Sequence, residues 1–258
     1  MKITTLAENT CPEKNLGFEH GLSLYIELGE KKILFDMGQT GLFADNAERL
    51  GIDLSEVDIA VLSHGHYDHA GGLARFLEIN KKAPVYLSKY AFEPHYNHSE
   101  KFIGMNASLK SNKQLRFTDG VTEIGEGLTL YSCNDRRKNS DLGGFGLNVE
   151  REGKLLPDDF RHEQYLLINE NGKTVLFSGC SHKGVINIVS WFEPDVLIGG
   201  FHFTELSPGR ILTNCARRLD SYETIYYTCH CTGVEQYEFM KPLMRNLHYL
   251  SGGQVIEI

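Results

Sequence analysis

One short segment, residues 63–72, constrains this chain more than any other part of it. It reads Ser-His-Gly-His-Tyr-Asp-His-Ala-Gly-Gly, so that three imidazoles and one carboxylate fall close together. The apolar run at residues 57–62 precedes it, and the amphipathic run at residues 73–79 follows it. Such runs are typical of a buried strand and of a helix, respectively. We therefore expect a loop that leaves the end of a strand and opens into a helix.

The side chains of this loop indicate metal ions. Alternate side chains of an extended loop point the same way, so we expect His64, His66 and Asp68 to converge, while His69 returns from the first helical turn. Nitrogen and carboxylate ligands packed this closely suit Zn²⁺ or a similar transition metal. Four such ligands exceed what one tetrahedral ion takes from one loop while it keeps a water molecule. The segment therefore predicts two metal ions side by side.

Composition and charge set wider limits. The chain has 258 residues, of which 41% are hydrophobic and 23% charged, which is ordinary for a globular protein with a substantial core. We expect a single domain over residues 1–258. The formal net charge of -8 gives no reason to expect a nucleic-acid partner. No run resembles a signal peptide or a membrane span, so we expect no membrane partner and a cytoplasmic location.

The chain reads as two rounds of paired strands, a reactive loop and a covering helix, which predicts two facing mixed sheets with helices outside. The expected strands are residues 2–6, 22–28, 32–35, 57–62, 85–87, 128–131, 164–168, 174–177, 196–198, 224–228 and 254–257. The expected helices are residues 42–50, 73–79, 184–192 and 235–246. Residues 134–159 lack apolar periodicity and are expected to form a functional flap or a mobile surface loop.

Strands of the second half end in residues that can bind a metal. Cys180 and His182 follow the strand at 174–177, His202 follows the strand at 196–198, and His230 follows the strand at 224–228. If these strands run toward one edge of the sheets, their loops meet at a single site. We expect His182 and His230 to be ligands.

Other residues have weaker or different roles. Cys180 is either a ligand or a small buried hydrophobe, and His162 has a weaker claim to a metal. Gly199 and Gly200 permit close backbone approach, so His202 is expected to contact the substrate or donate a proton rather than bind a metal. Four further residues are expected to have ordinary surface, packing or structural roles: His95, His98, His248 and Cys229.

With these motifs in order, the chain resembles the metallo-β-lactamase superfamily. The resemblance rests on His-Gly-His-Tyr-Asp-His-Ala-Gly-Gly at residues 64–72, on Leu-Phe-Asp-Met-Gly at residues 34–38, and on the late His230. It implies a four-layer αβ/βα sandwich with the metal site at one edge between the sheets. The segments at residues 19–23, 178–184, 199–202 and 230–233 resemble a branch of metal-dependent hydrolases that includes a dihydropterin-aminobenzene-phosphate synthase of methanopterin assembly.

The resemblance also implies a division of the ligands. It assigns His64 and His66 to one metal, and Asp68, His69 and His230 to the other. Most members carry a bridging aspartate where this chain has Cys180, and the usual third histidine of the first site is not evident. We prefer His182 for that place and keep His162 as the alternative. The expected ions are zinc, with manganese or iron as alternatives.

The predicted activity is hydrolysis of an ester, phosphoester or similar bond of a small molecule. A water held by such ions loses a proton near pH 7 and can attack as hydroxide. We expect Asp68 to orient this water and His202 to act on the substrate. Arg136, Arg137 and Lys138 form either part of a flap over an anionic, phosphorylated substrate or only a solvated loop.

Three alternatives stay open at this stage. The branch resemblance implies a transferase that joins a dihydropterin diphosphate to an aryl amine with loss of diphosphate. A di-iron redox protein on the same fold would usually carry a carboxylate where this chain has His66. A non-catalytic metal-binding or regulatory module would bind metal without turnover.

Overall fold

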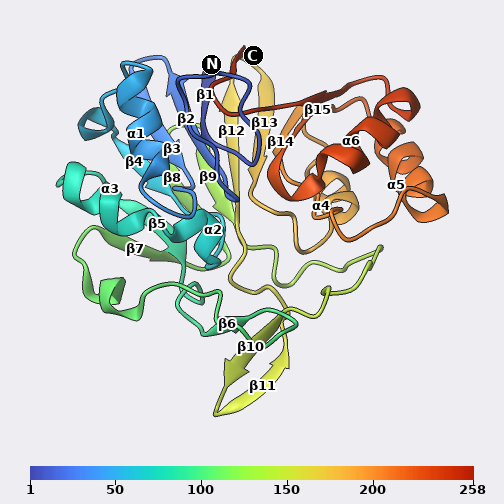
Figure 1. Ribbon diagram of the computed structural model, residues 1–258, viewed down its shortest axis with the longest axis horizontal. Helices are drawn as coiled ribbons and strands as arrows, with labels where there is room; N and C mark the ends of the chain where they lie inside the picture. The colour runs from blue at the N-terminus through green and yellow to red at the C-terminus, as the bar shows by residue number, and fades with distance from the viewer.

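Two large mixed sheets face each other in the computed structural model, which describes residues 1–258 (Figure 1). Across the first sheet the strands are β17 (Val255–Glu257), β1 (Lys2–Ala7), β2 (Ser23–Leu28), β3 (Lys31–Phe35), β4 (Ile59–Val61), β5 (Val85–Ser88) and β7 (Leu115–Thr118). Across the second they are β16 (Leu247–Tyr249), β15 (Ile225–Thr228), β14 (Val196–Gly199), β13 (Lys173–Ser178), β12 (Tyr165–Glu170), β9 (Leu128–Tyr131) and β8 (Val121–Gly125).

Both sheets follow the same plan. Antiparallel neighbours make up one side of each sheet, as in β1, β2 and β3 or in β9, β12 and β13. Parallel neighbours make up the other side, from β3 through β4 and β5 to β7, and from β13 through β14 and β15 to β16. The two rounds expected from the sequence are therefore two halves of similar topology.

Helices cover the outer face of each sheet (Figure 1). They are α1 (Leu42–Arg49), α2 (Tyr67–Ala70), α3 (Leu73–Ile79), α4 (Val185–Phe192), α5 (Arg210–Asp220) and α6 (Val234–Met240). Short 3₁₀ turns are η1 (Leu54–Glu56), η2 (Ala107–Ser111), η3 (His230–Thr232) and η4 (Lys241–Leu243). None of these helices has the length and apolar character that a membrane crossing requires.

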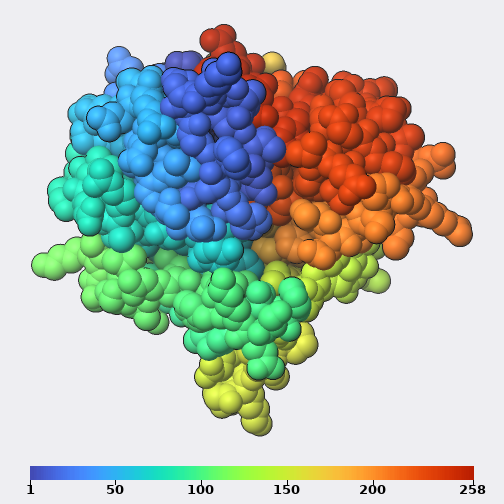
Figure 2. All heavy atoms as spheres, viewed as in Figure 1, coloured from blue at the N-terminus to red at the C-terminus, as the bar shows by residue number.

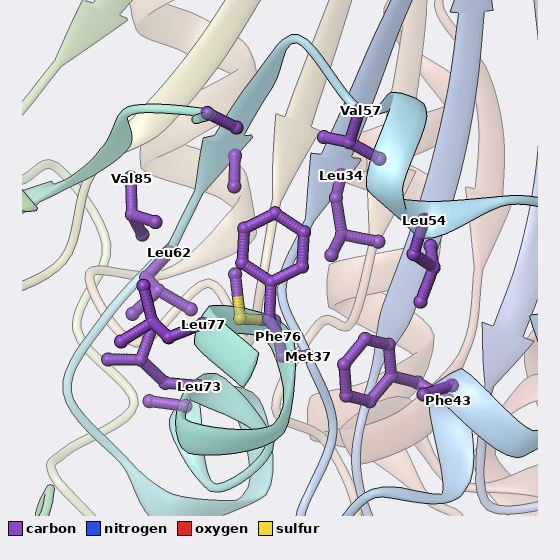
Figure 3. Close-up of a cluster of buried hydrophobic side chains, with 14 of the residues drawn as sticks. Leu34, Met37, Phe43, Leu54, Val57, Leu62, Leu73, Phe76, Leu77 and Val85 are labelled. Atoms are coloured by element: carbon purple, nitrogen blue, oxygen red, sulfur yellow. The ribbon is translucent and has the colours of Figure 1, made fainter. Parts of the chain in front are cut away.

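The apolar strands are buried on both faces, which explains why they read as continuous hydrophobic runs. In β3, Phe35 points between the sheets and packs 5.7 Å, ring to ring, from Phe177 of β13. Its neighbour Leu34 points outward to the core beneath α1 and α3 (Figure 3). In β13, Leu176 likewise points outward to the core beneath α4 and α5. The four-layer αβ/βα sandwich implied by the resemblance is confirmed.

The structure corrects two expectations about the chain. Helix α6 ends at Met240 rather than near residue 246, because the chain turns through η4, which contains Pro242, and then forms strand β16. Residues 134–159 are not one irregular passage, since they contain the hairpin of β10 (Asn148–Arg151) and β11 (Lys154–Pro157). Strand β10 also pairs with β6 (His95–Tyr96), and the hairpin projects from the body of the molecule (Figures 1 and 2).

The two halves are joined beside the histidine loop at residues 63–72. The backbone N–H of Gln164, just before β12, donates to the carbonyl of Ser63 at 2.8 Å. The Gln164 side-chain amide donates to the carbonyl of Leu62 at 2.9 Å. These bonds fix the end of β4, which carries the histidine loop, against the second sheet.

Candidate metal centre

The histidine loop lies where the sequence predicted it, between β4 and α2. His66 is the N-cap residue of α2, and Asp68 and His69 belong to its single turn. The loop is held tightly, because a Cβ at Gly65 would lie only 2.1 Å from the carbonyl oxygen of Ala91. All four predicted ligands of this loop are buried.

One group of candidate ligands consists of His64, His66 and His182. One nitrogen of each lies within 4.8 Å of the others. The Nε2 atoms of His64 and His182 are 3.3 Å apart. His182 comes from the loop after β13, so the structure brings it to the place for which the sequence preferred it.

The second group consists of Asp68, His69, Cys180 and His230. Nε2 of His69 lies 3.0 Å from the Cys180 sulfur and 3.1 Å from Nε2 of His230. Nε2 of His230 lies 3.2 Å from Oδ2 of Asp68. The two groups adjoin, since the ring centres of His64 and His69 are 4.2 Å apart. All seven residues expected to bind metal therefore meet in one place.

Hydrogen bonds behind the second group determine where its protons lie. Nδ1 of His69 faces Oδ2 of Asp36 at 2.6 Å, and Nδ1 of His230 faces Oδ1 of Asn9 at 2.8 Å. Both partners are acceptors, so each Nδ1 carries a proton, and in the neutral ring each Nε2 presents a lone pair. Two lone pairs and the carboxylate of Asp68 thus face one another across about 3 Å, which a cation would stabilise.

The same logic applies to His64. The Ser63 hydroxyl donates to Oδ2 of Asp36 at 2.7 Å and lies 2.8 Å from Nδ1 of His64. Because that hydroxyl proton is already engaged, Ser63 accepts from Nδ1, and the lone pair on Nε2 faces His182. Nε2 of His66 and Nδ1 of His182 are buried without any partner. The nitrogen, sulfur and carboxylate donors fit two transition-metal cations.

Burial sets the protonation states of these rings. It lowers the pKa of His64, His66 and His182 well below the usual 6.5, and lowers that of His230 to about 4. These imidazoles are therefore neutral at pH 7, the form that binds metal. Burial also raises the pKa of the Cys180 thiol well above 9.0.

His69 and Asp68 behave differently from these rings. Burial opposes the charge on His69, but Asp36 and Asp68 outweigh it and raise the pKa of this ring above 6.5. Burial likewise opposes the charge on Asp68, yet His69, His20 and His230 hold the pKa of its carboxyl well below 3.8. Asp68 is therefore ionised at the centre of the second group.

The backbone at the centre is strained where strands end. Asp36, Ser181, His202 and His230 have φ angles of 59°, 59°, 55° and 49°, in the left-handed region that residues other than glycine rarely adopt. Such strain concentrates at functional sites because the surrounding structure must hold it.

A pocket of about 400 Å³ opens onto the two groups. Its inner wall contains His66, Asp68, Cys180 and His182 from the candidate ligands. The other lining residues are His20, Tyr67, Asn97, His98, Ile103, Phe145, Leu147, His202, Thr204, Glu205 and Cys231. This volume lies within the range of small-molecule binding sites.

Comparison with known proteins agrees with this geometry. Residues 16–222 match the model of the metallo-β-lactamase superfamily. The chain belongs to this superfamily. Its members are generally metal-dependent hydrolases. The crystal structure of Tm1679, a metal-dependent hydrolase of the β-lactamase superfamily, matches with a TM-score of 0.85 and 29% identity, over 100% of this chain and 99% of that chain.

Two relatives from Methanocaldococcus jannaschii match over nearly their whole length. One is the uncharacterized protein MJ0448, 29% identical over 271 residues that cover 99% of this chain and 100% of the relative. The other is 7,8-dihydropterin-6-methyl-4-(β-D-ribofuranosyl)-aminobenzene-5'-phosphate synthase, 28% identical over 290 residues that cover 100% of this chain and 96% of the relative. The resemblance to this branch of the superfamily is confirmed.

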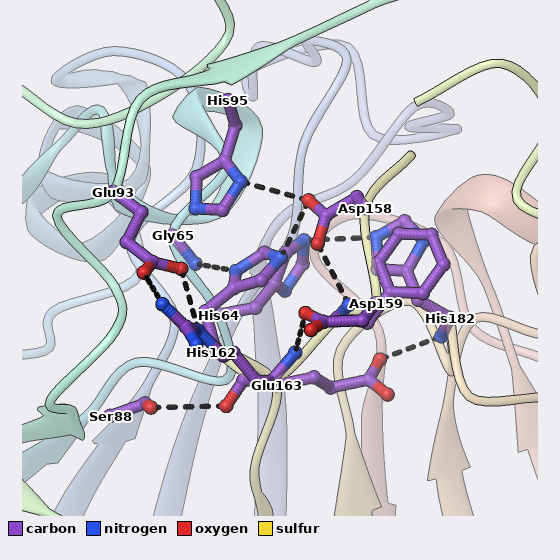
Figure 4. A network of polar contacts seen from close by, with 12 residues as sticks. His64, Gly65, Ser88, Glu93, His95, Asp158, Asp159, His162, Glu163 and His182 are labelled. Carbon is purple, nitrogen blue, oxygen red and sulfur yellow. Dashed lines mark hydrogen bonds and ion pairs between the residues drawn. The ribbon is translucent and has the colours of Figure 1, made fainter. Parts of the chain in front are cut away.

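Several residues lie apart from the two groups. His202 lines the pocket, with its ring centre 4.4 Å from that of His182. The backbone at Gly200 lies close to Cys231, as the sequence predicted, because a Cβ at Gly200 would lie 2.4 Å from the Cys231 sulfur. His162 does not join the candidate ligands of the first group and instead accepts from the N–H of Gly65 at 2.9 Å (Figure 4).

The remaining expectations have mixed outcomes. His248 is exposed and stacks on Tyr227, as a surface residue would. His98 lines the pocket, which the sequence did not indicate. Arg136, Arg137 and Lys138 are exposed, and of these Lys138 borders a smaller cavity of about 160 Å³ beside the pocket.

Most of the residues that orient the candidate ligands were not predicted from the sequence. Asp36 lay in a recognised motif but had no assigned role, whereas Glu8, Asn9 and Glu163 were not singled out. Glu8 accepts from the N–H of His230 at 2.6 Å, and Glu163 accepts from the N–H of His182 at 2.6 Å. Asp36, Glu8 and Asn9 directly follow buried strands of the superfamily fold. The signal that identified the histidines, a polar residue just after an apolar strand, would have found them.

Proposed function

We propose that this protein hydrolyses an ester, phosphoester or similar bond of a small molecule with the help of two divalent metal ions. The observation that carries the proposal is the convergence of seven candidate ligand side chains in two adjoining groups, four of which line one pocket. Zinc is the preferred ion because the donors are imidazole, thiol and carboxylate, with manganese and iron as alternatives.

The chain's own residues have distinct tasks in this reaction. His64, His66 and His182 hold one ion, and Asp68, His69, Cys180 and His230 hold the other. When bound, these ions supply an activated water and stabilise the negative charge that develops on the substrate. The ionised Asp68 accepts a hydrogen bond from the attacking water and orients it.

His202 acts on the substrate from the wall of the pocket, where its ring lies beside that of His182. Burial lowers the pKa of this ring, against the opposing influence of Glu163 and Asp68, so the ring is neutral at pH 7. A neutral imidazole still donates one N–H, and this donor stabilises the substrate oxygen or the leaving group. For this role the His202 ring must lie in the pocket, but it need not bind a metal ion.

The lining also suggests the chemistry of the substrate. His20, His98, Asn97 and Thr204 line the pocket with side chains that can donate hydrogen bonds. Such donors suit the oxygens of a phosphoryl or carboxyl group, and Phe145 offers a face for an apolar or aromatic portion. We propose a small, phosphorylated molecule as the partner, and no nucleic acid or membrane.

A second function is favoured by one specific comparison. The relative named as a dihydropterin-aminobenzene-phosphate synthase aligns with the whole of this chain. A transferase that couples a dihydropterin diphosphate to an aryl amine would use the same pocket, with the amine nitrogen in place of water as nucleophile and diphosphate as leaving group.

A paired assay separates the two functions. The protein is incubated with zinc and a panel of nitrophenyl esters, phosphodiesters and lactones, and separately with a dihydropterin diphosphate and an aryl amine. Hydrolysis of the panel that disappears in His66→Ala supports the hydrolase. A coupled pterin-amine product supports the transferase and overturns the hydrolase proposal. Metal binding without turnover in either arm overturns both.

A further inference from the structure

The loop between β1 and β2 places one further histidine, His20, against the second group of candidate ligands. Nε2 of His20 lies 3.2 Å from Oδ2 of Asp68, and its ring centre lies 4.9 Å from that of His230. The four ligands of the second group are buried, whereas the His20 side chain is 53% exposed and lines the pocket. His20 belongs to none of the groups that could hold an ion. It therefore contacts the metal centre without being a candidate ligand.

The backbone next to His20 is held against α2. The N–H of Leu22 donates to the carbonyl oxygen of Asp68 at 3.2 Å. A Cβ at Gly21 would lie 2.5 Å from that same oxygen, so a larger residue could not occupy this position without a shift. These contacts place the His20 ring beside the Asp68 carboxylate. The segment at residues 19–23, which the sequence singled out without a role, thus has a place at the metal centre.

The side-chain amide of Asn9 determines which nitrogen of His20 carries the proton. The N–H of Gly21 lies 3.2 Å from one atom of this amide, and because an N–H only donates, that atom is the oxygen Oδ1. The other atom, Nδ2, lies 3.3 Å from Nδ1 of His20. The amide nitrogen donates there, so Nδ1 of His20 accepts, and its Nε2 carries the proton that faces Asp68.

The same amide gives His230 the opposite tautomer. Oδ1 of Asn9 lies 2.8 Å from Nδ1 of His230 and accepts its proton, so Nε2 of His230 presents a lone pair. One asparagine therefore makes His20 a donor toward Asp68 and makes His230 a potential metal ligand.

The Asp68 carboxylate depends on such a donor for its orientation. The last torsion of an aspartate side chain is broad, so hydrogen bonds rather than rotamer preference fix the plane of the group. Oδ2 of Asp68 lies 3.2 Å from Nε2 of His230 and 3.8 Å from Nε2 of His69, so this oxygen faces the ligands of the second group. In their neutral forms these two rings present lone pairs and cannot donate to it. His20 supplies the N–H that they lack.

We propose that His20 is a positioning residue for the second ion, because its Nε2–H donates to Oδ2 of Asp68 and holds that oxygen toward the ion. Carboxylates that bind metal are commonly held by an outer hydrogen bond, and loss of such a partner lowers metal affinity about 10- to 100-fold. His20 acts on the ion through Asp68 alone. The inference rests on the metal pair of the proposed function, but not on the reaction that the pair supports.

Stepwise metal affinity tests the proposal. Zn²⁺ is titrated into metal-free wild type, His20→Leu, His20→Gln and the surface control His248→Gln, in competition with a chromogenic chelator that resolves one dissociation constant for each ion. His230→Gln, which removes a ligand of the second group, identifies the constant that belongs to that group. We expect His20→Leu to weaken this constant about 10- to 100-fold and to leave the other unchanged. His20→Gln, whose amide keeps an N–H, should recover part of the loss.

The half-exposed position of His20 favours variants that fold, which circular dichroism verifies. Equal constants in wild type and His20→Leu would overturn the proposal. An equal loss at both groups, or no recovery in His20→Gln, would overturn it as a general effect on structure. Loss of the second ion at saturating Zn²⁺ in His20→Leu would make this residue a ligand instead. These results leave the proposed function intact if wild type binds two ions, whereas a wild type that binds fewer overturns both proposals.

Discussion

Oδ2 of Asp36 lies 2.6 Å from Nδ1 of His69, and both side chains are completely buried. The same carboxylate oxygen accepts from the hydroxyl of Ser63, which in turn accepts from His64. One aspartate therefore orients a histidine in each of the two metal groups. Its φ angle of 59° shows that the backbone is held in an unfavourable conformation to place it there.

Replacing Asp36 with Asn should weaken the binding of both ions. The amide keeps the size of the side chain but loses the charge that fixes the protons on His69 and Ser63. Loss of such an outer partner lowers metal affinity by about 10- to 100-fold, measurable by competition with a chromogenic chelator. Asp58→Asn is the matched control, because Asp58 accepts only a backbone N–H of Lys32 near the surface. Equal affinity in Asp36→Asn and Asp58→Asn would contradict this role.

Metal-free protein should lose stability as the pH falls. The pKa of His230 is lowered by burial to about 4, and burial holds the pKa values of His64, His66 and His182 well below 6.5. The unfolded chain therefore binds more protons than the folded one once the pH falls below about 6.5. The stability these neutral rings contribute is present above pH 6.5 and is lost as the pH falls toward 4.

His69 contributes to the pH dependence of stability with the opposite sign. Its raised pKa contributes stability below pH 6.5 that is lost as the pH rises through its folded value. The four rings whose pKa is lowered contribute more to the pH dependence of stability than the one ring whose pKa is raised. The melting temperature of the metal-free protein should therefore fall between pH 7 and pH 4.5. His230→Gln should show a shallower decline, because it removes one of the four. A melting temperature that rises on acidification would refute this account.

Cys180 should be a thiolate ligand once the metal is bound. Cobalt-loaded wild type should show the near-ultraviolet charge-transfer band of a sulfur–cobalt bond, and Cys180→Ser should lose it. Cys231→Ser is the control, since the Cys231 sulfur lies near Cys180 but belongs to neither group of candidate ligands. Cys180→Asp, which restores the carboxylate usual in the superfamily, should keep both pocket ions. An unchanged band in Cys180→Ser would exclude the thiolate.

His202 should affect turnover without affecting metal content. His202→Ala removes the N–H donor from the pocket and should lower kcat about 100-fold, the lower range for a positioned proton donor, with ion counts as in wild type. His202→Gln retains an N–H and should recover part of the rate. His248→Gln, far from the pocket on β16, should leave both kcat and KM unchanged. A loss of ions in His202→Ala would instead make this residue a ligand.

The sequence was most informative where chemistry and pattern coincide. The loop at residues 63–72 predicted four ligands because their spacing and the flanking apolar runs fix both the residue types and their direction. His182 and His230 were also predicted, since each follows an apolar strand. The helix at 210–220 was not expected, although Leu212, Cys215, Ala216 and Leu219 form its buried face at helical spacing.

The proximity of His66, His95, Asp158 and His162 could not be predicted from the sequence. His95 was expected to be an ordinary surface or packing residue because no partner stands near it in the chain. Its neighbours come from residues 158 and 162, and only the pairing of β6 with the β10–β11 hairpin brings them together. Local patterns predict local structure, whereas this cluster depends on long-range strand pairing that no short motif encodes.

The most direct test of the central claim is turnover measured against metal content. Protein stripped of metal is titrated with Zn²⁺ while hydrolysis of a chromogenic phosphodiester is followed, in wild type and in His66→Ala. The account predicts no turnover without metal, a rate that rises as the pocket ions bind, and a variant that lacks an ion and essentially all activity. Turnover by the metal-free protein, or full metal content in His66→Ala, would contradict it.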